Sequence, residues 1–444
     1  MLLSSLEIKN YRSLEQVKLD NLQQFNVLIG RNNAGKSSVF GALRDLGEVL
    51  AGRGISGDLI TARDAARSLE ISLLFKPRPE EREQFVDALI ASGFPNDRQA
   101  AVLNSPLLRK VQFSFKATGY NLSLLHLRET KIFTEDSQWA VIQRMTGDER
   151  AANPQHQYAL IGHASILASG SVNAALLDID KGQNNNATQL QPQTVATSWS
   201  TDPALNWLFD RLGKYFSNAY FFNPFRHSTA QSNTEGNLTL SQDGSNLAQV
   251  LHTINSNDRR KFAAIERFIH SALPDIGELQ TPIPIGSTTT EVAFKSAEGY
   301  NVRLHEMGGG IEQLLMVATV LLTTTADHPL FLEEPESHLH AGAQRFLLEK
   351  LYDGERQVFI TTHSPVFINL ARPFSVYQVA YAKGRTSIKN CDAASLDVVL
   401  EDIGVRNSDV LLSDAVLFVE GPGDKEVVSI FSDVTIQKGY AVAG

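Results

Sequence analysis

Cysteine is nearly absent from this sequence: Cys391 is the only one among 444 residues. A disulfide framework within the chain is therefore excluded, and the cytoplasm is the expected compartment. Long apolar runs are missing too, since nothing approaches the ~18 consecutive apolar residues of a membrane-spanning helix. The first residues contain neither a long apolar core nor a small-residue cleavage site, so no secretory signal is predicted. We therefore expect no membrane partner.

Positive charge is also scarce: 40 Lys and Arg stand against 49 Asp and Glu, which gives a net charge of −9. Phosphate contacts need local positive charge, so indiscriminate binding to nucleic acid is disfavoured. DNA or another nucleic acid would have to contact a concentrated basic patch or a second chain. A chain of this length exceeds one typical core, which predicts two or three domains.

Apolar runs and helical periodicities alternate along the chain. Residues 25–30 read FNVLIG, as in a buried central strand, and residues 36–50 place apolar side chains on one helical face. The alternation returns between 219 and 363, which predicts an α/β fold with a mostly parallel sheet. Residues 183–200 are instead rich in Asn and Gln and poor in large apolar groups, so we expect a mobile surface loop there.

The segment from Gly30 to Ser37 (GRNNAGKS) fits the phosphate-loop pattern G-x-x-x-x-G-K-[ST]. It follows an apolar strand and opens a helix, which is the context that supports the motif. Glycines let main-chain N–H groups converge on phosphate oxygens, and the helix N-terminus favours an anion. Lys36 is predicted to neutralise the β- and γ-phosphates of ATP, and Ser37 to hold Mg²⁺. The predicted nucleotide contacts are Gly30, Arg31, Asn32, Asn33, Ala34, Gly35, Lys36, Ser37 and Ser38.

Two further strands end in chemically active side chains. The stretch PLFLEEPE is an apolar strand that leads into carboxylates. We assign Glu333 to the Mg²⁺ shell and Glu334 to the water that attacks the γ-phosphate. The stretch VFITTHSP is a strand that ends at His363, which is predicted to sense or stabilise the γ-phosphate. Together with Lys36, Glu334 and His363 are the predicted catalytic residues.

The stretches GRNNAGKS, LFLEEPESHLH and ITTHSP together resemble the ATPase heads of ABC proteins of the RecF and SMC type. More specifically, the chain resembles the overcoming-lysogenization-defect (OLD) family of ATPase–nucleases, with IKNYRSLEQVKL, DGSNLAQVL and EMGGGIEQLL as supporting stretches. The resemblance implies an ABC-type P-loop head with a mostly parallel sheet, an antiparallel β subdomain and a helical insertion. The implied domains are the first half of the head (1–76), a variable insertion of mixed structure (77–218) that is a candidate surface for dimerisation or a partner, the second half of the head (219–385), a linker (386–412) and the start of a Toprim-like α/β domain (413–444).

The resemblance assigns Gly308, Gly309 and Gly310 to a signature loop that caps the γ-phosphate bound by an opposite subunit, with Gln313 just inside the helix. The sequence itself supports part of this assignment. Three glycines precede the apolar helix IEQLLMVATVLL, whose N-terminus attracts an anion. Two positions depart from the wider family: a glycine stands where the signature serine is usual, and Glu333 replaces the common aspartate. The implied assembly is a homodimer or a higher oligomer.

Near residue 420, AVLFVEGPGDK resembles the first motif of a Toprim domain, the metal-dependent nuclease module of OLD proteins. By that match, Glu420 and Asp424 are ligands of Mg²⁺ or Mn²⁺ at a second metal site. A Toprim site also needs an Asp-x-Asp strand end, and no such pair follows Asp424. Two interpretations stay open: residues beyond 444 complete the domain, or the nuclease fold is a remnant and a partner cleaves.

The predicted function is therefore an OLD-like ATPase, in which ATP closes two heads and controls a DNA endonuclease in bacterial antiphage defence. Two alternatives stay open. The first is an ATP-dependent sensor or scaffold without nuclease activity, which holds or activates an effector such as a toxin, a nuclease or a retron component. The second is a RecF-like repair ATPase, against which the lack of a long heptad stretch argues.

Overall fold

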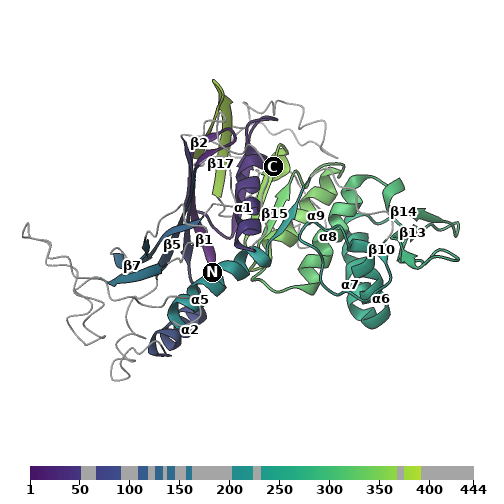
Figure 1. Ribbon diagram of the computed structural model, residues 1–444. Coiled ribbons are helices and arrows are strands. Elements are labelled where there is room, and N and C mark those ends of the chain that lie inside the picture. The colour runs from purple at the N-terminus through teal and green to yellow at the C-terminus, as the bar shows by residue number, and fades with distance from the viewer. Residues whose placement is uncertain are drawn as a thin grey trace, which may run out of the picture.

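The structure, a computed structural model, describes most of both halves of the predicted head. Its strands form two large sheets and two small ones (Figure 1). Within the described residues, no helix is long and apolar enough to cross a membrane. The described residues are 1–51, 67–91, 109–118, 126–133, 138–145, 157–162, 203–223, 232–367 and 375–391.

The central sheet has six strands, in the spatial order β18 (Arg385–Cys391), β17 (Ser375–Ala382), β3 (Phe25–Ile29), β16 (Val358–Thr362), β15 (Leu330–Glu333) and β9 (Tyr220–Phe222). The strands from β17 to β9 run parallel, and β18 pairs antiparallel with β17 at the edge. Every residue of β3 and of β16 is buried, as expected for parallel strands that are covered on both faces.

The second large sheet has seven strands, in the order β2 (Leu14–Asp20), β1 (Leu2–Tyr11), β4 (Ser68–Lys76), β5 (Lys110–Thr118), β6 (His126–Phe133), β7 (Gln138–Met145) and β8 (Gln157–Gly162). All of its strand pairs are antiparallel. Along β4, buried and half-buried residues alternate, so one face of the sheet packs on the core and the other meets solvent. Strands β5 to β8 come from the predicted insertion, which therefore extends the sheet that the first half of the head begins.

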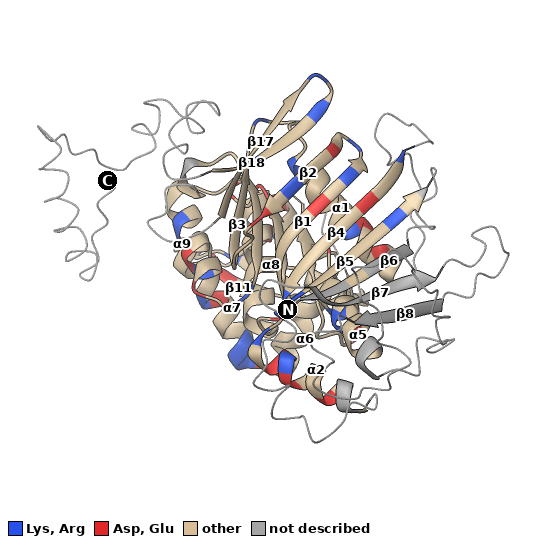
Figure 2. Cartoon of the chain, turned by 90° about the vertical axis from the view of Figure 1, so that its left-hand side faces the viewer, with Lys and Arg blue, Asp and Glu red and all other residues tan. Residues whose placement is uncertain are grey.

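The outer face of this antiparallel sheet carries charges of both signs (Figure 2). Lys9 lies 3.4 Å from Glu7 and 3.5 Å from Glu70, and Lys116 lies 3.3 Å from Glu70. Ion pairs at a solvated surface stabilise a fold by about 0–1 kcal/mol each. Since acids and bases alternate here, this part of the face lacks the net positive charge that DNA phosphates require.

Helices cover both faces of the central sheet and form two separate cores (Figure 1). Side chains alternate between the faces along each strand, so Val27 lies in one core and its neighbour Leu28 in the other. The core with Leu28 is covered by α1 (Lys36–Leu50), α2 (Pro79–Ala91) and α5 (Pro203–Ser217). The core with Val27 is covered by α6 (Leu247–Asn257), α7 (Arg259–Ala272), α8 (Gly309–Thr323) and α9 (Ala341–Tyr352).

Two small sheets lie beyond α6 and α7, at the far side of the molecule from the antiparallel sheet (Figure 1). One pairs β10 (Ser232–Asn233) with β12 (Thr289–Thr290), and the other joins β11 (Glu278–Gln280), β13 (Ala293–Lys295) and β14 (Asn301–Arg303). A short 3₁₀ helix, η5 (Leu304–Glu306), then leads into α8, and another, η6 (Pro365–Phe367), follows β16.

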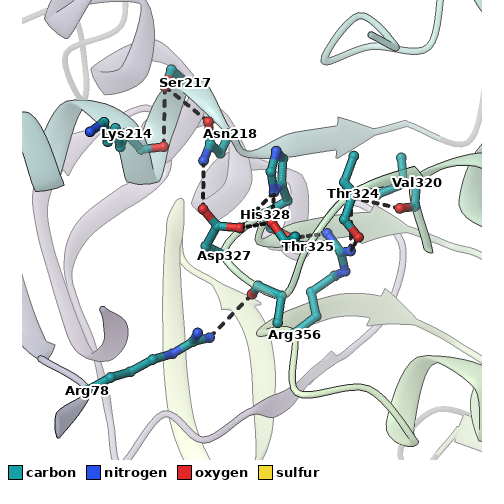
Figure 3. A network of polar contacts seen from close by, with 11 residues as sticks. Arg78, Lys214, Ser217, Asn218, Val320, Thr324, Thr325, Asp327, His328 and Arg356 are labelled. Carbon is teal, nitrogen blue, oxygen red and sulfur yellow. Dashed lines mark hydrogen bonds and ion pairs between the residues drawn. The ribbon is translucent and has the colours of Figure 1, made fainter. Parts of the chain in front are cut away.

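Polar side chains before β16 hold several loops together at the edge of the sheet where its parallel strands begin (Figure 3). The guanidinium of Arg356, which is 4% exposed, donates to the carbonyl oxygens of His328 (2.6 Å) and Thr324 (3.2 Å). Burial lowers the pKa of Arg356 to about 10. Arg78, which follows β4, donates to the carbonyl oxygen of Ala326 (3.4 Å) and so connects the antiparallel sheet to the same loop.

The architecture confirms the predicted α/β class, with a mostly parallel sheet and an antiparallel β subdomain. One boundary needs correction: the predicted linker starts at 386, yet 386–391 form most of β18 and pair with β17. The insertion contains strands as well as helices, because its apolar alternation continues an existing sheet. The loop predicted at 183–200 and the Toprim-like start at 413–444 lie outside the described residues.

Candidate nucleotide-binding site

Three neighbouring strands of the central sheet end at the same edge. β16 lies between β3 and β15, and the three run parallel. Because the carboxyl ends of parallel strands meet at one edge, the residues that follow them come together. The phosphate loop follows β3, Glu334 follows β15 and His363 follows β16. The fold therefore joins Lys36 to His363, although 327 positions separate them.

The phosphate loop has a backbone that its glycines permit. Gly35 has φ 103° and Asn33 has φ 63°, both in the left-handed region. A Cβ at Gly35 would lie 2.3 Å from Oγ1 of Thr386, and one at Gly30 would lie 2.0 Å from the carbonyl oxygen of Val379. Helix α1 then begins at Lys36, so its positive end lies at the loop. Both glycines thus let the loop lie directly against β17 and β18, and the start of α1 offers main-chain N–H groups to an anion.

Lys36 folds back onto this loop. Its Nζ donates to the carbonyl oxygens of Gly30 (2.7 Å) and Arg31 (3.1 Å), and it lies 2.7 Å from Nε2 of His363. The residue is only 5% exposed. In these three contacts the amine meets uncharged acceptors, and a bound anion would supply the opposite charge.

Burial changes the acid–base properties of both residues. It lowers the pKa of Lys36 to about 8, although three nearby carboxylates act in the opposite direction. Burial, and secondly the charge of Lys36, lowers the pKa of His363. Nε2 of His363 also lies 3.3 Å from Oε1 of Glu334. One nitrogen cannot accept from Lys36 and donate to Glu334 at once, so the shorter contact indicates a neutral ring with its proton on Nδ1.

Oxygen ligands suitable for a metal meet beside the lysine. The hydroxyl of Ser37 donates to a carboxylate oxygen of Glu333. Hydroxyl and carboxylate oxygens are the hard ligands that Mg²⁺ prefers, so this pair fits the metal. The described part of the chain contains no group of three or more acidic, His or Cys side chains that could hold a metal by itself. Mg²⁺ at this point would take its other ligands from phosphates and water.

The turn after β15 gives Glu334 an unusual backbone, with φ 46°. Its N–H donates to the carbonyl oxygen of Thr361 (2.8 Å), and its own carbonyl accepts from Ser337 (3.0 Å). The turn separates the two adjacent carboxylates: Glu333 contacts Ser37, and Glu334 contacts His363.

Thr386, which the sequence did not suggest as a site residue, supports the phosphate loop through a hydrogen bond. Oγ1 of Thr386, in β18, donates to the carbonyl oxygen of Ala34 (2.9 Å) and lies 2.8 Å from Oγ of Ser13. The main-chain N–H of Thr386 donates to the carbonyl oxygen of Ser13 (2.9 Å). Residue 386 falls in the predicted linker, and 352 positions separate it from Ala34, so no local pattern pointed to this contact.

The glycine cluster lies at the start of α8 and contacts its own chain. Helix α8 begins at Gly309, and a Cβ at Gly310 would lie 2.8 Å from a methyl group of Leu339. At Gly308 an added Cβ would meet no atom within 4 Å, so this glycine faces open space. The amide nitrogen of Gln313 is buried and has no hydrogen-bond partner among the described residues. Glu420 and Asp424, the predicted second metal site, lie outside the described residues.

Family models match both parts of the site. Residues 1–50 match one described as an AAA ATPase domain. Residues 183–369 match one described as an AAA domain, whose description also names the AbiEii toxin and a Type IV TA system. A stretch of 42 residues is 45% identical to an uncharacterized protein of Methanocaldococcus jannaschii, and it covers 10% of this chain and 19% of that protein.

Solved SMC heads are similar to the chain at low identity. The SMC head domain from Thermotoga maritima has 12% identity and a TM-score of 0.39, over 88% of this chain and 100% of that one. An Smc head bound to the C-winged helix domain of ScpA has 14% identity and a TM-score of 0.45, over 89% and 99%. An Smc head with an extended coiled coil, bound to the C-terminal domain of ScpA derived from Pyrococcus furiosus, has 14% identity and a TM-score of 0.43, over 90% and 99%.

The phosphate loop between β3 and α1, the acidic end of β15 and the two ATPase family models define the class of this protein. The chain is an ATPase of the phosphate-loop class, and both family models describe AAA domains. ATPases of this fold use ATP and usually Mg²⁺.

Proposed function

We propose that this chain hydrolyses ATP between two copies of itself. The observation that carries the proposal is the convergence of Lys36, His363 and Glu334 at the edge where β3, β16 and β15 end. Nε2 of His363 lies 2.7 Å from Nζ of Lys36 and 3.3 Å from Oε1 of Glu334. A buried lysine with uncharged partners beside a glycine-permitted loop suits a triphosphate. Glu334 would polarise the attacking water, and His363 would contact the γ-phosphate.

Binding would change the contacts of Lys36. The amine would leave the carbonyl oxygens of Gly30 and Arg31 for phosphate oxygens, which are stronger acceptors because they are charged. Ser37 and Glu333 would hold Mg²⁺, which neutralises charge that develops on the phosphates. The remaining predicted loop contacts, from Asn32 to Ser38, would supply main-chain donors.

A second copy would complete the site through its glycine cluster. Gly308 faces open space, and the positive end of α8 lies next to it. We propose that Gly308, Gly309 and Gly310 of one copy cap the γ-phosphate on the other, which makes a homodimer or a higher oligomer the active form. ATP would then favour the closed pair because it contacts both copies.

We further propose that head closure controls cleavage of DNA or another nucleic acid, as in OLD-like enzymes of antiphage defence. Glu420 and Asp424 would bind the second Mg²⁺ or Mn²⁺ of a Toprim-like site. The support is the resemblance of the motifs. Since the described outer face of the antiparallel sheet has paired charges, the nucleic-acid contact would use another local patch or a second chain.

A second candidate function is control of a partner effector without nuclease activity in this chain. The observation that favours it is the family model over 183–369, whose description names a toxin of a Type IV TA system. In that case ATP would set whether the heads hold or release the effector.

The hydrolytic proposal is tested with three purified proteins: the unaltered chain, Lys36→Ala and Glu334→Gln. Lys36→Ala should lose binding of ATP, because the cation at the phosphates is gone. Glu334→Gln should bind ATP, hydrolyse it at least about a hundredfold more slowly and elute as a stable dimer in ATP and Mg²⁺. Glu298→Gln, on an exposed turn between β13 and β14, is the matched control. Unchanged turnover in Glu334→Gln would remove Glu334 from the reaction.

The nuclease proposal is tested by incubating plasmid DNA with the protein and Mg²⁺ or Mn²⁺, with and without ATP. Glu420→Ala should retain hydrolysis of ATP and lose metal-dependent cleavage. Cleavage that persists in Glu420→Ala would place the nuclease elsewhere. Absence of cleavage in the unaltered chain, together with ATP-dependent capture of a toxin or nuclease, would favour the second candidate.

A further inference from the structure

The third glutamate of the stretch PLFLEEPE makes contacts that none of the roles above explains. Glu336 lies two positions beyond Glu334, and its side chain contacts the end of β16. Its Oε1 accepts from the hydroxyl of Thr362 (2.6 Å) and from the main-chain N–H groups of His363 (2.7 Å) and Ser364 (3.2 Å). One carboxylate oxygen thus binds three donors on consecutive residues, of which the middle one is His363.

The other carboxylate oxygen of Glu336 is buried without a compensating contact in the described part of the chain. Oε2 of Glu336 is shielded from solvent and has no hydrogen-bond partner among the described residues. Burial raises the pKa of Glu336 above its usual range, although its hydrogen bonds act in the opposite direction. Burial of a carboxyl group with one oxygen unsatisfied costs free energy. A glutamate at this position therefore requires a compensating role, and its contacts are with the main chain of His363 and its neighbours.

A second side chain supports the same loop. Oγ of Ser364 donates to Oε1 of Gln344 (2.8 Å), while Nε2 of Gln344 donates to the carbonyl oxygen of Leu339 (2.8 Å). The N–H of Ser364 also donates to Oγ1 of Thr362 (2.9 Å). The loop after β15, the start of α9 and the loop after β16 are therefore joined by side chains, with Glu336 at the centre.

We propose that Glu336 is a positioning residue, which fixes the main chain of His363 so that its ring meets Lys36 and Glu334. Without Glu336, the N–H groups of His363 and Ser364 lose their shared acceptor, and the loop is free to move the ring. This proposal rests on the proposed hydrolysis of ATP for its kinetic consequence, whereas the position of the ring can be measured without nucleotide.

The kinetic test compares Glu336→Ala with Glu336→Gln, because the amide oxygen of Gln can accept the same three hydrogen bonds. Glu336→Ala should lower kcat at least about tenfold, since small displacements of a catalytic group are costly, and change the Kd for ATP less than about threefold. Glu336→Gln should restore kcat to within about threefold of the unaltered chain. Glu298→Ala, on an exposed turn, is the control. An equal loss in Glu336→Ala and Glu336→Gln would show that the charge acts directly and would overturn the proposal.

The structural test uses NMR of protein with ¹³C-labelled histidine rings and no nucleotide. The His363 resonance is assigned by its loss in His363→Gln, among 11 histidines in the chain. It should shift or broaden in Glu336→Ala and return in Glu336→Gln; an unchanged resonance in Glu336→Ala would overturn the proposal even if the chain hydrolyses no ATP. If Glu336→Ala does not fold, Gln344→Ala replaces it, because Gln344 is half-buried on α9 and supports the same loop. A His363 resonance that Gln344→Ala leaves unchanged would count against the proposal.

Discussion

Nζ of Lys36 lies 2.7 Å from Nε2 of His363, which places the amine and the imidazole in direct contact at the end of two parallel strands. Burial lowers the pKa of both residues, and the charge of Lys36 lowers the pKa of His363 further, because two cations at this distance repel. A negatively charged ligand would reverse both effects. The contact therefore makes the protonation of the empty site different from that of the nucleotide-bound site.

Binding of ATP is predicted to take up protons at mildly alkaline pH. In the free protein Lys36 has a pKa of about 8, lowered by burial, so at pH 8 roughly half of the molecules carry the charge. Phosphates raise this pKa, and bound molecules are then fully protonated, with an uptake of about half a proton at pH 8. At pH 7 Lys36 is already charged and its own uptake approaches zero, so uptake at pH 7 would come from other groups such as His363.

The measurement is isothermal titration calorimetry of ATP binding in buffers with different enthalpies of ionisation. A binding enthalpy that depends on the buffer at pH 8, in the unaltered chain and in His363→Gln alike, supports the prediction. Independence of the buffer at pH 8 would mean that Lys36 is fully charged before ATP arrives.

Gly35→Ala is predicted to weaken binding of ATP at least about tenfold. The substitution meets two obstacles: φ of 103°, which costs a residue with a Cβ about 1–3 kcal/mol, and a Cβ 2.3 Å from Oγ1 of Thr386. The loop must then move away from Thr386 or change its φ, and either change displaces its main-chain donors. Fluorescence titration with a labelled ATP analogue measures the Kd.

The matched control for this variant is Gly384→Ala. Gly384, at the turn between β17 and β18, has φ 82°, but an added Cβ there meets no atom within 4 Å. It carries the same kind of backbone strain without contact to the phosphate loop, so the Kd for ATP should stay within about threefold of the unaltered value. If both variants bind alike, the contact between Gly35 and Thr386 has no part in nucleotide binding.

Much of the site was predictable because its residues end apolar strands. In an α/β sheet, strand ends share an edge, so Lys36, Glu334 and His363 could be placed together from three separate stretches. The same alternation of strands and helices indicated the parallel sheet. The roles of these residues stay predictions, whereas the structure shows that they lie side by side.

The supporting residues were not predictable from the sequence. Their partners lie far away along the chain, and their residue types form no recognisable motif. Thr386 contacts Ala34 only because β17 lies beside β3 in the sheet. Glu336 was visible as part of PLFLEEPE, but the direction of its side chain depends on the turn at Glu334, with φ 46°. Side-chain hydrogen bonds of this kind follow from tertiary packing, which periodicity along one segment does not encode.

A further distant contact joins the two large sheets. Nε2 of Gln357 donates to the carbonyl oxygens of Leu3 (2.7 Å) and Gln23 (3.0 Å), and Oε1 accepts from the N–H of Leu3 (2.9 Å) and the hydroxyl of Tyr215 (3.1 Å). Gln357 is 2% exposed and uses all four of its hydrogen-bonding positions. Gln357 directly precedes β16 of the central sheet, and its side chain therefore connects that strand to β1 of the antiparallel sheet.

Gln357→Leu is therefore predicted to destabilise the nucleotide-free protein by about 2 kcal/mol or more, because it leaves buried donors and acceptors of Leu3, Gln23 and Tyr215 unsatisfied. A loss of this size lowers Tm by about 2 °C or more in a chain of 444 residues, measured by circular dichroism during heating. Gln16→Leu, on the exposed side of β2, is the control and should leave Tm nearly unchanged. Leucine at position 357 cannot make the hydrogen bonds of Gln357. Equal Tm values for the two variants would therefore show that apolar packing, and not these hydrogen bonds, holds the two sheets together.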